Sequence, residues 1–78
     1  MKTQIREFLA EHIPGYLLQD NDDIFAMGLV NSLFAMQLVL FVEQEFDISV
    51  EGDDLDLSNF RTINAIADLV QRKRAMVT

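Results

Sequence analysis

Residues 28–33, with the sequence GLVNSL, bring a single serine to the start of a predicted helix. The following stretch, Phe34–Phe46, contains neither proline nor glycine, which favours a continuous helix from about Ser32 to Phe46. Asn31 is a preferred N-cap residue, so Ser32 is expected on the first helical turn. Free backbone N–H groups and the positive end of the helix dipole suit this position to a phosphate ester. We therefore interpret Ser32 as an attachment point rather than as a catalyst.

The predicted helix from Ser32 to Phe46 has two contrasting faces. At about 100° per residue, one broad face gathers the expected core residues, which are Phe34, Ala35, Leu38, Phe41, Val42 and Phe46. The opposite, exposed side gathers Ser32, Met36, Val39, Leu40 and Glu43. Three of these five residues are apolar, which is not typical of a purely solvated face. Either a neighbouring element or another protein is expected to cover them.

Two further helices are predicted on either side of this one. Thr3 is the expected cap of a first helix, whose apolar positions Ile5, Phe8, Leu9 and Ile13 share one face before Pro14-Gly15 ends it. Thr62 is the expected cap of the last helix, in which Ile63, Ile66, Ala67 and Val70 repeat with helical spacing. Residues 55–60 are expected to form one short helical turn. The sequence therefore predicts an all-α fold, a small bundle of three longer helices and one short helix.

The connections between these helices also carry apolar residues. Residues 14–31 form a long connection for so small a domain, expected to be held to the core by Tyr16, Leu17, Leu18, Ile24, Phe25, Met27 and Leu29. Within it, residues 20–23 are interpreted as a solvated acidic turn. In the second connection, residues 47–54, Ile48 and Val50 are expected to face inward and Gly52 to permit a turn.

Size and charge limit the classes of function. The 78 residues predict a single domain, 1–78, and the net charge of −7 opposes binding to nucleic acid or anionic membranes. This acidity suits partners with basic docking patches, or it only keeps a chain that is 50% hydrophobic in solution. The cations of residues 72–74 are interpreted as helix-end charges. We expect a cytoplasmic protein, because the N-terminus leads directly into an amphipathic segment and the longest apolar run, Leu38–Val42, is too short to span a bilayer. We also expect a monomer.

Enzymatic and metal sites are poorly supported by the sequence. The residues two positions from Ser32 are Val30 and Phe34, where a nucleophile elbow needs glycines. Nothing in the sequence places the single histidine, His12, near Ser32, so we interpret it as a structural or surface residue. The chain has no cysteine, and its acidic loops lack the glycine and glutamate of a calcium-binding loop. We therefore expect neither catalytic residues nor a metal site.

Three stretches together resemble the acyl carrier protein family over nearly the whole chain. They are DIFAMGLVNSL at residues 23–33, VEQEF at residues 42–46 and FRTI at residues 60–63. The resemblance implies a four-helix carrier in which a phosphopantetheinyl transferase adds 4′-phosphopantetheine from coenzyme A to Ser32. The arm's thiol would then hold an acyl group as a thioester. In this interpretation Gly28 permits a tight turn and Leu33 anchors the helix start in the core.

The resemblance also implies a surface that partner enzymes recognise. It comprises Asn31, Leu33, Phe34, Met36, Gln37, Val39, Leu40 and Glu43. Asn31 stands where the family usually has aspartate, and Phe34 and Gln37 stand where many members have acidic residues. Phe34 is either a core-edge residue or an apolar contact beside the arm.

The stretch VNSLFAMQLV at residues 30–39 looks like freestanding carriers that build unusual polyketide extender units, such as methoxymalonyl, hydroxymalonyl or aminomalonyl thioesters. Partners would then include a loading enzyme, enzymes that oxidise the acyl thioester, and an acyltransferase or synthase of an antibiotic-type pathway. A peptidyl or D-alanyl carrier is the alternative within the family. An unmodified helical interaction module, with Ser32 only as a helix cap, is the alternative from another class.

Overall fold

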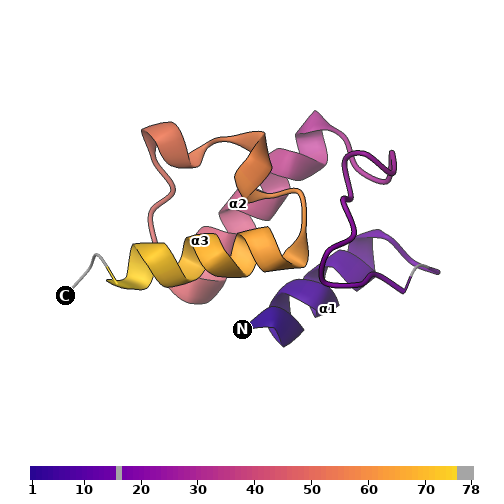
Figure 1. The fold of residues 1–78 in the computed structure, drawn as a ribbon, viewed down its shortest axis with the longest axis horizontal. Helices are drawn as coiled ribbons and strands as arrows, with labels where there is room; N and C mark the ends of the chain where they lie inside the picture. The colour runs from indigo at the N-terminus through magenta and orange to yellow at the C-terminus, as the bar shows by residue number, and fades with distance from the viewer. Residues whose placement is uncertain (16, 76–78) are drawn as a thin grey trace.

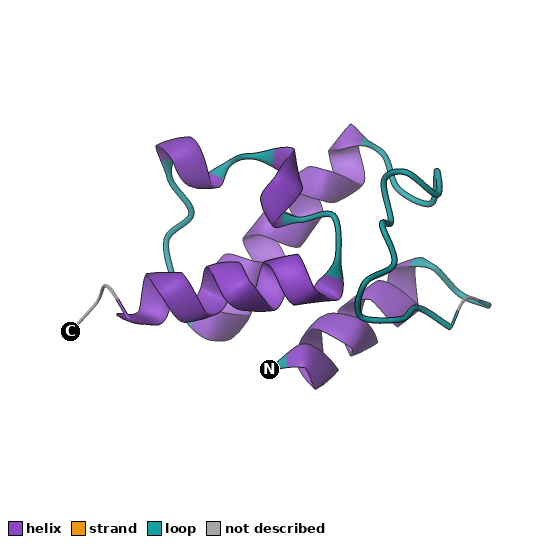
Figure 2. Ribbon diagram, in the orientation of Figure 1, coloured by secondary structure: helices purple, strands orange, loops and turns teal. Residues whose placement is uncertain are grey.

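The computed structural model describes residues 1–15 and 17–75. They form three α-helices, α1 (Lys2–His12), α2 (Ser32–Phe46) and α3 (Ile63–Ala75), and two short 3₁₀ turns, η1 (Gly52–Asp54) and η2 (Leu57–Asn59) (Figure 1). No strand occurs in this described part of the chain (Figure 2). The predicted all-α fold is confirmed. The turn at η2 lies in the predicted short segment, whereas η1 was predicted only as a turn at Gly52.

The helix boundaries follow their capping residues. α2 has the predicted bounds and ends at Asp47, whose left-handed backbone (φ 54°) breaks the helix. The predicted cap of α3 is confirmed, because the Thr62 hydroxyl oxygen accepts a hydrogen bond from the Ala65 N–H at 2.9 Å. The predicted cap of α1 is wrong. This helix begins at Lys2 with Met1 as its N-cap, so Thr3 already lies inside it.

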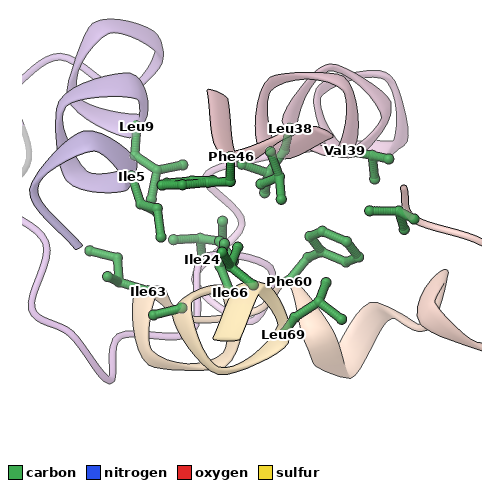
Figure 3. Packing of buried hydrophobic residues seen from close by; sticks show 14 of the residues in the cluster. Ile5, Leu9, Ile24, Leu38, Val39, Phe46, Phe60, Ile63, Ile66 and Leu69 are labelled. Carbon is green, nitrogen blue, oxygen red and sulfur yellow. The ribbon is translucent and has the colours of Figure 1, made fainter. Parts of the chain in front are cut away.

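All three helices and both connections contribute to one apolar core. Figure 3 shows the labelled side chains of the helices pointing toward one another across this core. The residues buried in it are Ile5, Leu9, Ile13, Leu18, Ile24, Leu38, Val39, Val42, Phe46, Ile48, Val50, Phe60, Ile63, Ile66, Ala67, Leu69 and Val70. Full burial of one aliphatic side chain contributes about 1.5–3 kcal/mol, so this cluster supplies the main driving force for folding.

The first connection is held to the core by fewer apolar residues than predicted. Leu18 and Ile24 are buried, and Phe25 and Leu29 pack partly against the core. Leu17 is 84% exposed and Met27 is also exposed, so the prediction is wrong for these two. Tyr16 lies outside the described residues.

The acidic turn of this connection, residues 20–23, was predicted to be solvated. Two of its carboxylates instead tether the connection to α1 and to the chain just before α3. Asp20 forms ion pairs with Lys2 and Arg6 of α1. Asp23 pairs with Arg61, just before α3, with 2.7 Å between the carboxylate oxygen and Nε. The Ile24 N–H donates to the Arg61 carbonyl at 2.9 Å, which fixes the same junction through the backbone. The sequence pattern did not reveal these partners because they lie far away along the chain.

The second connection is attached to α2 and α3. Ile48 and Val50 are buried, as predicted. The Glu43 carboxylate accepts a hydrogen bond from the Val50 N–H at 2.9 Å. Lys73 of α3 pairs with Asp54 of η1 at 2.7 Å. Arg72, Lys73 and Arg74 lie in the last turn of α3, as predicted, and Lys73 in addition holds η1 to this helix.

Candidate functional site

The candidate site is the start of α2, where Asn31 caps the helix. Asn31 has an extended backbone (φ −125°, ψ −177°), and its side-chain oxygen accepts a hydrogen bond from the Phe34 N–H at 2.9 Å. Its carbonyl accepts from the Ala35 N–H at 3.0 Å. These contacts confirm the predicted cap and place Ser32 at the first helical position.

The turn that precedes this cap is fixed by its own hydrogen bonds. Gly28 has φ 73°, a left-handed conformation in which any side chain would strain the backbone. The Gly28 N–H donates to the Phe25 carbonyl at 3.0 Å, and the Leu29 N–H donates to the Ile24 carbonyl at 3.1 Å. The turn therefore delivers the chain to Asn31 in a defined direction.

Asp23 fastens the other end of this turn. Its carboxylate accepts hydrogen bonds from the N–H groups of Ala26 and Phe25 and from the side chain of Arg61. The Ala26 N–H, and after it Arg61, lower the pKa of Asp23 below its usual value of 3.8. The carboxylate is thus charged at neutral pH and holds the turn against the start of α3.

Ser32 itself is exposed and chemically available. Among the described residues, its hydroxyl has no hydrogen-bond partner, and the N–H groups of Ser32 and Leu33 have no acceptor. Such free N–H groups at a helix start favour an anionic group on the serine oxygen. The geometry can therefore hold a phosphate ester without displacing any protein contact.

Two hollows flank this end of α2. One, of about 250 Å³, is lined by His12, Phe34 and residues 28–31. The other, of about 270 Å³, is a more apolar groove lined by Ala35, Met36, Val39, Leu55, Asp56, Leu57 and Phe60. The His12 ring packs beside that of Phe34, with 5.2 Å between the ring centres. No hydrogen bond between His12 and Ser32 occurs in the described structure, which therefore shows no catalytic pair.

Comparison with known proteins identifies the family to which the chain belongs. The model of the family described as "Phosphopantetheine attachment site" matches residues 3–70. The chain belongs to the phosphopantetheine-attachment family. It is 36% identical to a D-alanyl carrier protein of Lactococcus lactis subsp. lactis (strain IL1403), over 95% of this chain and 96% of the relative. It is 37% identical to the one of Lactococcus lactis subsp. cremoris (strain MG1363), over 94% and 95%, and 36% identical to an aminoacyl carrier protein of Agrobacterium fabrum (strain C58 / ATCC 33970), over 91% and 89%.

The family's cofactor is covalent 4′-phosphopantetheine. When bound, this group supplies a flexible arm whose terminal thiol takes up an acyl group. The start of α2 fits such a group, because it combines an unpartnered hydroxyl with two free N–H groups. Carriers of this family work with a phosphopantetheinyl transferase and with acyl-handling enzymes.

Most of the predicted recognition residues of α2 lie on an exposed surface beside this site. Asn31, Leu33, Met36, Gln37 and Leu40 are exposed, and Phe34 is half-buried against Phe8 and His12. Leu33 is 70% exposed, so the expectation that it anchors the helix start in the core is wrong. A residue on the first turn of α2 projects beyond the end of the bundle, where no other element covers it.

Val39 and Glu43 differ from their predicted exposure. Val39 is only 9% exposed, and it shares the apolar groove with Leu57 and Phe60. Glu43 is half-buried and binds the Val50 N–H. From the sequence, either a neighbouring element or another protein was expected to cover this face of α2. The chain itself covers the part that contains Val39 and Glu43.

The sequence reasoning did not single out Leu55 and Leu57 as surface residues. Both are exposed, and they form one wall of the groove opposite Met36. The spacing of two in Leu55-Asp56-Leu57 is the signal that could have identified them as a pair, because it places both side chains on one side of an extended chain.

The described residues contain no cluster of histidine, cysteine, aspartate and glutamate that could hold a metal ion. Within the same described part, no helix is long and apolar enough to cross a membrane.

Proposed function

We propose that this chain is a carrier protein modified with 4′-phosphopantetheine at Ser32. The observation that carries the proposal is the capped start of α2, which presents an exposed, unpartnered hydroxyl next to two free N–H groups. The Ser32 oxygen attacks the phosphorus of coenzyme A that carries the pantetheine. The bond to the bridging oxygen breaks, 3′,5′-ADP leaves, and the serine proton passes to a base of the transferase. The chain supplies the nucleophile and its position, and the transferase supplies the catalysis.

The cargo that we favour is an aminoacyl group held as a thioester. Support comes from the relatives, which are named D-alanyl carrier protein and aminoacyl carrier protein and match this chain over almost their whole length. A small polar cargo also suits a site flanked by two hollows that are open to solvent. The carrier would receive this cargo from an amino-acid-activating enzyme and present it to a biosynthetic enzyme.

The second candidate is a carrier for unusual polyketide extender units. It rests on the stretch at residues 30–39, in which Asn31, Phe34 and Gln37 replace residues that are usually acidic. Its partners would be a loading enzyme, enzymes that oxidise the thioester, and an acyltransferase or synthase. An aminomalonyl cargo would satisfy both candidates, because it is an aminoacyl group and an extender unit.

The test of the attachment is the intact mass of the purified chain after incubation with coenzyme A, Mg²⁺ and a broad-specificity phosphopantetheinyl transferase. We expect the wild type to gain one phosphopantetheine and Ser32→Ala to gain none, with unchanged helicity in the variant. A gain in both would place the arm elsewhere. No gain in either, from a sample shown to be unmodified and folded, would favour the unmodified interaction module.

The test of the cargo follows on the modified protein. It is incubated with ATP, D-alanine and a D-alanine-activating enzyme, or with a small polar acyl donor and its loading enzyme, and the mass is measured again. A mass increase that matches one D-alanyl group, on protein that already carries the arm at Ser32, supports the first candidate. Loading only by the acyl donor supports the extender-unit carrier.

A further inference from the structure

One hollow of the molecule is not used by the proposed attachment. It measures about 250 Å³ and lies where the end of α1 meets the chain entering α2. Its lining comprises His12, Phe34 and residues 28–31, so Asn31 on its rim directly precedes the attachment serine. Figure 1 shows the connection that contains residues 28–31, as it passes α1 and then turns into α2.

The walls of this hollow offer unpaired hydrogen-bonding groups. The N–H groups of Val30 and Asn31 have no acceptor among the described residues. His12 lies with Nδ1 3.0 Å from the Phe8 carbonyl oxygen. Because that oxygen can only accept, Nδ1 donates in this contact, and Nε2 is left available for another partner. Two residues that line the hollow, Val30 and Asn31, thus each have an N–H group without an acceptor in the described structure, and His12 contributes a ring nitrogen without a printed partner.

The apolar part of the same hollow adjoins a cluster of aromatic rings. The His12 ring stands 4.4 Å from the Phe8 ring and 5.2 Å from the Phe34 ring, measured between ring centres. Leu29 and Val30 add aliphatic surface. This cluster fixes the direction of the imidazole although the residue is exposed.

The charge of the lining also distinguishes this hollow. None of its lining residues is acidic, although the chain has 13 Asp and Glu residues. By contrast, the apolar groove includes Asp56, and a smaller groove of about 150 Å³ between α1 and α2 includes Glu7, Glu11 and Glu45. A phosphodiester tethered at Ser32 meets the least repulsion on the side of His12.

We propose that this hollow is the resting site of the pantetheine arm, a site that rests on the proposed function of Ser32. The arm has two secondary amides, a pair of methyl groups and a charged phosphodiester. The N–H groups of Val30 and Asn31 would bind its carbonyls, His12 Nε2 would bind one of its amides, and Phe34 and Leu29 would hold its methyl groups. The apolar groove beside Leu57 offers fewer polar partners, because its Asp56 carboxylate already binds the N–H and hydroxyl of Ser58. The arm would therefore leave that groove open while the carrier is unloaded.

The experiment is NMR on the modified protein, with labelled protein and unlabelled arm. Intact mass first establishes that every sample carries the arm. Nuclear Overhauser contacts are then recorded between the arm and the protein, and we expect them at the ring protons of His12 and Phe34. In His12→Ala, which carries the same mass, we expect loss of the contacts at Phe34 and the return of the Val30 amide shift to its value in the unmodified protein. Leu57→Ala, in the opposite groove, is the matched control and should retain them.

The outcomes separate this inference from the proposed function. Absence of the mass gain in the wild type would contradict the attachment at Ser32 itself. A mass gain with contacts at Met36, Leu55 and Leu57 would place the arm in the apolar groove and overturn the resting site. A mass gain with no contact beyond residues 31–33 would show a free arm and overturn it as well.

Discussion

Asn31 has one measurable role at the scale of a single residue, which is to hold the start of α2. Its side-chain oxygen is the acceptor for the Phe34 N–H. We expect Asn31→Ala to lower the free energy of unfolding by about 1 kcal/mol, because that N–H loses its partner. For a domain of this size the change corresponds to a fall in melting temperature of roughly 4–8 °C, measured by circular dichroism. Asn31→Asp keeps the acceptor and should keep the stability. Equal melting temperatures for the wild type and the alanine variant would contradict the cap.

Glu43 is a second residue whose role is structural. Its carboxylate accepts the Val50 N–H at 2.9 Å and so holds the chain that leaves α2. Removing a hydrogen-bond partner from a partly buried N–H costs about 1–3 kcal/mol, so we expect Glu43→Ala to destabilise the fold by about that amount in urea unfolding. Glu43→Gln retains an oxygen acceptor and should recover most of the loss. Equal destabilisation by both variants would assign the effect to charge rather than to the hydrogen bond.

These two residues show which side-chain roles the sequence can predict. Asn31 and Thr62 act on N–H groups three residues away, so their identity and position in the chain were sufficient to predict them. Glu43 acts seven residues away and Asp23 acts on Arg61 across 38 residues. Both partners come close only when the helices pack, and no local pattern encodes that proximity.

At the scale of the element, α2 has one face in the core and another that the chain covers only in part. Its bounds were predictable, because they depend on a local cap and on the absence of breakers. Which residues of its second face are buried and which are exposed was not predictable. Val39 and Leu40 are neighbours in sequence, yet Val39 is buried in the groove beside Phe60 and Leu40 is 53% exposed. The chain after η1 decides this difference, because it covers one residue and leaves the other bare.

The exposed part of α2 is expected to contact partner enzymes, starting with the transferase that modifies Ser32. Leu40→Glu places a charge on this surface without disturbing the core. We expect the rate of phosphopantetheine addition to fall about tenfold, which corresponds to about 1.4 kcal/mol of lost contact energy. The measurement is a time course of intact mass, with helicity recorded on the same sample. Lost helicity would show that Leu40 supports the fold, and an unchanged rate would remove it from the recognition surface.

Leu38→Ala is the matched control on the opposite side of the same helix. Leu38 is fully buried, so its truncation is expected to cost about 2–5 kcal/mol of stability. In samples that remain folded at low temperature, the rate of modification should stay close to that of the wild type. The pair therefore separates recognition from stability within one element.

At the scale of the whole molecule, the Lys and Arg side chains of the described structure contact other residues of the same chain. The six Lys and Arg residues of the chain are Lys2, Arg6, Arg61, Arg72, Lys73 and Arg74. Five of them form ion pairs with Asp20, Asp23, Asp54 and Asp68. The sixth, Arg74, stands 6.0 Å over the Phe46 ring. Most carboxylates are left without a cationic partner in the described part, so the molecule presents an acidic surface that suits partners with basic patches.

Two of these ion pairs, those of Asp54 and Asp23, predict how the stability of the fold changes in acid. Lys73, followed by the Glu51 N–H, lowers the pKa of Asp54 below its usual value of 3.8, and the Ala26 N–H and Arg61 lower that of Asp23. Since the unfolded chain takes up these protons first, the contribution of both carboxylates is complete above about pH 3.8 and is lost as the pH falls through the lower folded values. We expect Asp54→Asn to be less stable than the wild type at pH 7, with the difference shrinking below pH 3.8, as measured by urea unfolding across this range. Asp53→Asn, at an exposed neighbouring residue without an ion pair in the described structure, should change stability little at either end. A difference for Asp54→Asn that stays constant with pH would show that its ion pair with Lys73 does not hold η1 to α3.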